Sequence, residues 1–203
     1  LVIPMDEHMD LFLDARNMGE TDSLTRSDLM VVRLEPSQRQ VNVTLVEVKV
    51  RAGLGGQLSP ELTNSIVTQL TNTETVVRNR LFAAHLRKRR FSLPAALRTQ
   101  RLIGLFRARV ARAVRHEFVD PSEADSLDEF INSMDRRFDI AIDRMGLVLD
   151  PAASESRIEE FDEARIHVIG KEEIDRVLNS PEQVQTQTGS EGEYLLTVLG
   201  ARG

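Results

Sequence analysis

Three polar residues flank two apolar runs of the sequence, at spacings that could bring them together. Asp28 stands before the run 29–34, and Glu47 and Lys49 lie near the end of the run 41–51. Both runs are rich in β-branched and apolar residues without Gly or Pro, which is typical of strands. Alternate residues of a strand share a face, so Glu47 and Lys49 point the same way. Charged groups on a buried strand are costly unless something binds them, so the pattern predicts a metal-sized site where the two strands converge.

The order of these residues resembles the motif of a nuclease superfamily. Ser27 and Asp28, then a strand, then Glu47-Val48-Lys49 are similar to the pattern of the PD-(D/E)XK nucleases, which include restriction endonucleases, Holliday-junction resolvases and RecB-type exonucleases. Ser27 stands where the motif name has Pro. The similarity covers roughly the first 80 residues. It implies an α/β fold with a restriction-endonuclease-like core, a mixed central sheet flanked by helices, here enlarged by a helical insertion.

The same resemblance implies a metal site that hydrolyses phosphodiester bonds. Asp28 and Glu47 would supply side-chain oxygens, and Val48 its backbone carbonyl, to Mg²⁺ or Mn²⁺, ions that prefer oxygen ligands. The metal would activate a water and stabilise charge on the phosphate. Lys49 would orient the attacking water and help to deprotonate it. The alternative is that Glu47 and Lys49 form an exposed ion pair at a strand end, worth about 0–1 kcal/mol.

Two residues outside the motif could complete this site. Glu7 begins a helix predicted for 6–16, and in the resembling family a first-helix Glu often joins the metal. Glu7 could equally favour the start of a helix through the helix dipole. Gln69 lies on a helix predicted from Ser59, and in RecB-like nucleases such a Gln reaches back towards the catalytic Lys and the DNA. The alternative for Gln69 is a surface side chain. The apolar stripe of that helix is Leu62, Ile66, Val67, Leu70, Val77 and Leu81.

Basic charge is concentrated in one segment of an acidic chain. The net charge is -6, yet residues 78–115 hold 12 Lys or Arg and no Asp or Glu. A cluster of this kind is the electrostatic footprint expected for a phosphate backbone, so DNA is the predicted partner. The arginines could instead pair with acidic parts of this chain or of another subunit, because a guanidinium also suits carboxylates. The predicted DNA-binding residues are Arg87, Lys88, Arg89, Arg90, Arg98 and Arg101.

The composition argues against several other classes of protein. The chain has 203 residues, of which 41% are apolar and 29% charged, as is typical of a globular protein. It has no Cys, which excludes a disulfide scaffold and fits a cytoplasmic location. No apolar run approaches the ~20 residues of a membrane span, and no signal peptide is visible. The four His have no ligand-like spacing, and the sequence has no Gly-x-Ser-x-Gly elbow and no dinucleotide-binding motif.

The order of the predicted elements divides the chain into two parts. We expect 1–77 and 138–203 to form the nuclease-like core and 78–137 to form a basic helical insertion. After the insertion we predict a strand or bent hairpin at 138–149, an exposed acidic segment at 152–163, a strand at 164–169, a short helix at 171–178 and a last strand at 192–199. That last strand resembles the one leading into the motor domain of FtsK- or HerA-like translocases. Because the sequence does not start with Met and stops at Leu-Gly-Ala-Arg-Gly203, we interpret the chain as a piece of a longer protein.

These patterns support functions of different classes. The first hypothesis is a metal-dependent DNA endonuclease domain in prokaryotic DNA restriction or phage defence, associated with an ATP-driven translocase. The second is a catalytically inactive module of the same fold that binds DNA or a partner subunit for such a translocase. A homo-oligomer is a further expected assembly. The third is an adaptor whose arginine-rich helix meets an acidic partner.

Overall fold

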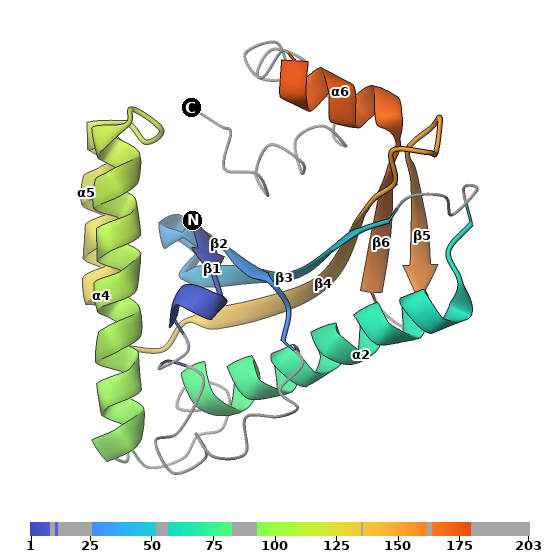
Figure 1. Cartoon of the computed structure of the whole chain (residues 1–203). Coiled ribbons are helices and arrows are strands. Elements are labelled where there is room, and N and C mark those ends of the chain that lie inside the picture. The colour runs from blue at the N-terminus through green and yellow to red at the C-terminus, as the bar shows by residue number, and fades with distance from the viewer. Residues whose placement is uncertain are drawn as a thin grey trace.

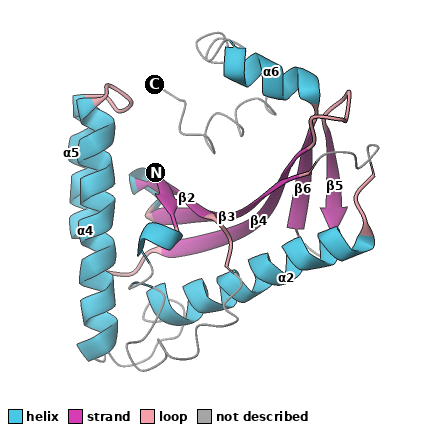
Figure 2. Cartoon of the chain, in the orientation of Figure 1, coloured by secondary structure: helices cyan, strands magenta, loops and turns pink. Residues whose placement is uncertain are grey.

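A six-stranded mixed sheet organises the chain. The computed structural model describes residues 1–8, 11, 26–51, 57–82, 93–134, 136–161 and 164–179. The strands are β1 (Val2–Pro4), β2 (Leu29–Glu35), β3 (Gln40–Val50), β4 (Asp139–Leu149), β5 (Arg157–Phe161) and β6 (Ala164–Ile169). They lie in the order β1-β2-β3-β4-β6-β5 with helices around the sheet (Figure 1, Figure 2). The predicted fold class is confirmed: the architecture is mixed α/β and consistent with a restriction-endonuclease-like core.

The two apolar runs form the predicted strands, β2 and β3, which pair as an antiparallel hairpin. The register pairs Leu29 with Val46 at the open end and Glu35 with Gln40 next to the turn. A 3-10 turn, η3 (Pro36–Gln38), connects the strands, and its proline presets the backbone angle that the turn requires. The register decides which residues of the two strands lie opposite one another, and hence which side chains can share a site.

After the helical segment the chain returns to the sheet in parallel with β3. In β4, Gly146 lies opposite Glu47 and Val148 opposite Lys49. β6 is parallel to β4, and β5 pairs with β6 in antiparallel orientation at the sheet edge. β4 is one continuous strand. We expected 152–163 to be an exposed acidic segment, but the structure places β5 within it, and only some residues of that strand are exposed. Its alternation of half-buried and exposed residues, charged among them, is typical of an edge strand.

The two faces of β3 belong to separate hydrophobic cores. Val43 and Leu45 are buried in the larger core. Val46 is buried in the smaller one on the opposite face, with Val48 packed against it. Side chains therefore alternate along β3 as the sequence predicted. Glu47 lies on the same face of β3 as Val43 and Leu45, at a position that an apolar residue would ordinarily occupy.

Helix α2 (Pro60–Val76) packs against β3 and β4 on the face of the larger core. Ser59 caps the helix, since its hydroxyl accepts a hydrogen bond from the Leu62 N–H at 3.2 Å. The close approach of α2 to the sheet depends on Gly146 of β4. A Cβ atom at Gly146 would lie 2.9 Å from Cγ2 of Ile66, which is too close for real carbon atoms. The missing side chain next to Glu47 thus lets the helix lie directly over the strands.

The remaining helices lie at the two ends of the sheet. They are η1 (Asp6–His8), the π-helical turn η4 (Val77–Leu81) that continues α2, α4 (Leu93–Arg115), α5 (Pro121–Asn132) and α6 (Lys171–Asn179). α4 and α5 pack side by side at one end and α6 lies at the other (Figure 1). Phe106 of α4 and Ile131 of α5 are buried in the same core as the sheet. Among the helices that the structure describes, none is long and apolar enough to cross a lipid bilayer.

Some sequence expectations concern residues that the structure does not describe. Most of the helix predicted for 6–16, the basic run 87–90 and the strand predicted for 192–199 lie outside the described residues.

Candidate active site

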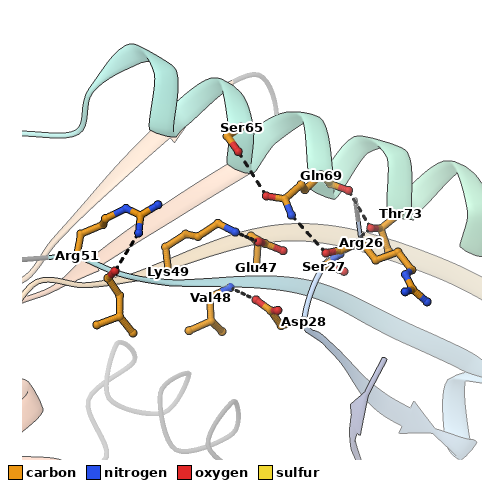
Figure 3. A network of polar contacts seen from close by, with 11 residues as sticks. Arg26, Ser27, Asp28, Glu47, Val48, Lys49, Arg51, Ser65, Gln69 and Thr73 are labelled. Carbon is orange, nitrogen blue, oxygen red and sulfur yellow. Dashed lines mark hydrogen bonds and ion pairs between the residues drawn. The ribbon is translucent and has the colours of Figure 1, made fainter. Parts of the chain in front are cut away.

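Asp28 and Glu47 both lie at the open end of the hairpin of β2 and β3. Leu29 lies opposite Val46 there, and Asp28 directly precedes β2. The two predicted carboxylates thus lie near each other at the open end of the hairpin: Asp28 is beside the Val48 backbone, and Glu47 is beside Lys49 under α2 (Figure 3).

The segment that carries Asp28 is held on both sides. The Val48 N–H donates a hydrogen bond to Oδ2 of Asp28 at 2.7 Å (Figure 3). On the other side, the Met5 N–H donates to the Asp28 carbonyl at 2.9 Å. The N–H and C=O groups of one strand residue point to the same neighbouring strand. The Val48 carbonyl, the third predicted ligand, therefore points to the side of β3 on which Asp28 lies.

The Glu47 carboxylate is buried and only half satisfied. Its side chain is 1% exposed, and Oε1 forms an ion pair with Nζ of Lys49, whose side chain is 23% exposed. Oε2 is buried and has no hydrogen-bond partner among the described residues. The ion pair considered as an alternative does form, but it is not exposed. A buried carboxylate oxygen without a partner is unfavourable, so Oε2 is a ready binding point for a cation.

Burial raises the pKa of the Glu47 carboxyl above its ordinary value. A hydrogen bond from Lys49 opposes this rise of the pKa, whereas the negative charge of Asp28 adds to it. The positive charge of Lys49 and the amide of Gln69 also act to lower the pKa. The pKa stays raised although a cation lies beside the carboxylate. Burial of the carboxyl therefore outweighs the effects of Lys49 and Gln69, which both lower this pKa.

Gln69 extends from α2 towards the strand that carries Glu47 (Figure 3). Its Nε2 donates to the Arg26 carbonyl at 3.5 Å, and its Oε1 accepts from the Ser65 hydroxyl at 3.5 Å. Hydrogen bonds of this length hold the amide weakly. The amide lies near enough to lower the pKa of Glu47, but it makes no hydrogen bond to Oε2. Gln69 is thus half-buried beside the predicted site and held by long hydrogen bonds.

Glu7 does not join the two carboxylates. It lies in η1 with 65% of its side chain exposed, and its Oε2 is 3.5 Å from a guanidinium nitrogen of Arg109 in α4. The same guanidinium is 3.3 Å from Nε2 of His8. Within the part of the chain that the structure describes, no three Asp, Glu, His or Cys residues form a group able to hold a metal ion. The candidate ligands are therefore the two carboxylates and the backbone carbonyl described above.

This set of ligands fits a hard divalent cation. Mg²⁺ takes oxygen ligands and usually keeps several waters beside one or two carboxylates, the rest coming from substrate phosphates. Asp28, Glu47 and the Val48 carbonyl match that pattern, and Oε2 of Glu47 offers an oxygen with no competing donor among the described residues. The set contains neither thiolate nor imidazole, the ligands that zinc prefers.

The predicted DNA-binding residues fall into two groups. Arg87, Lys88, Arg89 and Arg90 lie outside the described residues. Arg98 and Arg101 lie on α4, where Arg101 is exposed and Arg98 is half-buried. α4 contains no acidic residue. Its other exposed arginines are Arg107, Arg112 and Arg115. These three lie in the basic segment 78–115 but were not among the predicted DNA-binding residues, because the sequence alone does not show which arginines face solvent.

One residue of the site, Thr73, was not singled out from the sequence as functional. The Thr73 hydroxyl accepts a hydrogen bond from the Ser27 N–H at 2.9 Å, and both residues are buried. A Thr inside a helix, four residues after Gln69, was the available signal. It was not specific, because such a hydroxyl commonly bonds only its own helix.

Fold and geometry together define a class of site. A mixed α/β sheet carries two carboxylates and a lysine at the open end of an antiparallel hairpin, under a helix that supplies an amide. No protein-family model, curated protein or solved structure matches this chain. The function must therefore be inferred from the site itself.

Proposed function

We propose that this chain is a metal-dependent DNA endonuclease domain that hydrolyses phosphodiester bonds with Mg²⁺ or Mn²⁺. One observation supports this most: Glu47 is buried next to Asp28, and its Oε2 has no partner among the described residues. A buried charge that is only partly compensated lowers stability, and such groups cluster at functional sites. Lys49 at the same carboxylate adds the proton-carrying group that hydrolysis requires.

Each residue of the site has a distinct task in this proposal. Asp28, Glu47 and the Val48 carbonyl would hold the cation, which when bound activates a water and stabilises charge on the phosphate oxygens. Lys49 is partly exposed, so its Nζ can hydrogen-bond a water next to the scissile phosphate and take part in moving its proton. Gln69 is weakly held, and its amide can turn to position Lys49 or a phosphate oxygen.

A second candidate function is an inactive module of the same fold that binds DNA or a partner subunit. Two observations favour it. Lys49 already neutralises one oxygen of Glu47, and Glu7 is engaged by Arg109 instead of the site. From the resemblance to the PD-(D/E)XK nucleases we further propose, for either function, a role in prokaryotic DNA restriction or phage defence in the cytoplasm. The chain would act there with an ATP-driven translocase or with further copies of itself.

Plasmid cleavage distinguishes these proposals. We expect the purified chain to nick or linearise supercoiled plasmid with Mg²⁺ or Mn²⁺, and EDTA to stop the reaction. DNA binding without cleavage in either metal would support the inactive module. Absence of DNA binding even at low salt would favour an adaptor whose arginines meet an acidic protein.

The exposed arginines of α4 are expected to contribute directly to DNA affinity. Each phosphate contact releases counterions, so changing Arg107 and Arg112 together to Gln should reduce the slope of log affinity against log salt by about 2. Fluorescence anisotropy with a labelled duplex measures this slope. The matched control changes Arg33 and Arg176 to Gln, which removes the same charge from other elements of the chain. An equal reduction in both double variants would show that α4 is not the contact surface.

A further inference from the structure

A buried hydroxyl links helix α2 to the segment that carries Asp28. Thr73 is 1% exposed, and its Oγ1 donates to the Gln69 carbonyl at 2.8 Å within the helix. The same oxygen accepts from the N–H of Ser27, 46 residues away, at 2.9 Å. Ser27 is also 1% exposed. The hydroxyl thus bridges a helix carbonyl and a backbone N–H immediately before Asp28 (Figure 3).

The Ser27 N–H depends on the Thr73 hydroxyl for its hydrogen bond. A buried backbone N–H needs a partner, and Ser27 lies before β2 begins, where no strand ladder provides one. The Ser27 hydroxyl itself is directed to the sulfur of Met5, at 3.3 Å. The Gln69 amide reaches the carbonyl of Arg26, but only at 3.5 Å. The bond from the Ser27 N–H to Thr73, at 2.9 Å, is thus shorter than the bond from Gln69 to the same segment.

We propose that Thr73 is a positioning residue of the candidate site: its hydroxyl holds residues 26–28 so that the Asp28 carboxylate reaches the Val48 N–H. Any effect of Thr73 on metal binding or DNA cleavage rests on the proposed function. The effect on the position of Asp28 does not, because it predicts only that a change on α2 weakens the hydrogen bond between Asp28 and the Val48 N–H of β3. A Thr that merely stabilised its own helix would have no effect there.

Thr75 provides a matched control on the same helix. Its Oγ1 donates to the Thr71 carbonyl at 3.0 Å, the same bond within the helix that Thr73 makes, but on the exposed side. Thr73→Val and Thr75→Val both remove a hydroxyl and keep the shape of the side chain. Thr73→Ser keeps the hydroxyl and removes a methyl group, so it separates the hydrogen bond from packing.

Amide hydrogen exchange of the whole chain, followed by NMR, tests the positioning role. In Thr73→Val we expect the Ser27 and Val48 amides to exchange about tenfold faster or more, because an unpartnered buried N–H is unfavourable. Thr73→Ser and Thr75→Val should exchange like the wild type at both amides. Faster exchange at Ser27 with no change at Val48 would overturn the proposal, as would equal effects of Val and Ser at position 73.

Binding of Mn²⁺ alone, measured by electron paramagnetic resonance, tests the catalytic meaning. Residues that orient metal ligands typically change metal affinity by 10–100-fold, so we expect about tenfold weaker binding in Thr73→Val and wild-type affinity in Thr73→Ser. Unchanged Mn²⁺ affinity in a folded Thr73→Val protein would overturn a role at the metal. If the wild type binds no Mn²⁺, the proposed function fails, and the exchange rates still decide whether Thr73 positions Asp28.

Discussion

Changing Glu47 to Gln is expected to lower the metal-dependent rate of DNA cleavage by about 10³-fold or more, since a bound metal stabilises transition-state charge by several kcal/mol. Gln keeps the shape of the side chain and removes its charge, so the cation loses one of the two carboxylates that face it. Initial rates of plasmid nicking at saturating Mg²⁺ measure the effect. DNA affinity in EDTA should remain unchanged, because the Glu47 side chain is buried.

Glu74→Gln is the matched control for this variant. Glu74 is also a largely buried, ion-paired carboxylate, and it bonds Arg78 and Arg144 instead of the site residues. We expect Glu74→Gln to cleave DNA at the wild-type rate. Cleavage that survives in Glu47→Gln, or that is lost equally in both variants, would contradict the role assigned to Glu47.

Stability against pH separates a lost metal ligand from a damaged fold. Burial raises the pKa of Glu47, so the folded state binds this proton more tightly than the unfolded state. The free energy of unfolding of the wild type therefore falls as pH rises through the raised pKa. Gln cannot ionise, so the free energy of unfolding of the variant does not fall in this way. The fall is about 1.4 kcal/mol for each unit by which the pKa of Glu47 is raised. Urea unfolding should show Glu47→Gln to be at least as stable as wild type above that pKa.

Lys49→Met is expected to lower the cleavage rate by about 10²–10⁴-fold, the usual contribution of a positioned proton-transfer group. Met keeps most of the length of the side chain but cannot orient or deprotonate a water. Both carboxylates remain, so Mn²⁺ binding should persist. Loss of the Lys49 cation raises the pKa of Glu47 further, because Lys49 acts to lower it. Wild type and Lys49→Met must therefore be compared at a pH well above the raised pKa of Glu47, where the carboxylate is ionised in both.

Lys171→Met at the exposed start of α6 controls for the loss of one positive charge. We expect this variant to cleave like the wild type. The two site variants then differ in kind: Glu47→Gln loses Mn²⁺ binding and cleavage, whereas Lys49→Met loses cleavage alone. Loss of Mn²⁺ binding in Lys49→Met at high pH would show that Lys49 only supports the geometry of Glu47.

Much of the hairpin could be predicted from the sequence, because alternation carries strong information. A strand that is apolar on both faces and then ends in Glu47 and Lys49 fixes which side chains share a face. The convergence of Asp28 with Glu47 follows once the hairpin register is known, and the short turn restricts that register. The alternation of side chains and the short turn between the two strands were sufficient to predict this part of the site.

The partners of Glu7 and of the Ser27 N–H could not be predicted in this way. Arg109 and Thr73 lie on helices far along the chain, and their positions depend on how those helices pack. An acidic residue in a first turn is equally consistent with a metal ligand, a favourable dipole contact and an ion pair. β5 was missed because an edge strand with charged residues lacks the apolar signal of a buried one.

The most direct test of the proposed site is the position of Mn²⁺ in crystals of the chain soaked with this ion. We expect an anomalous peak between the carboxylates of Asp28 and Glu47 and within bonding distance of the Val48 carbonyl, and we expect no such peak in Glu47→Gln. Crystals that bind Mn²⁺ elsewhere, with Lys49 still the partner of Glu47 and no ion between the two carboxylates, would contradict the assignment of this site as a metal-dependent nuclease centre.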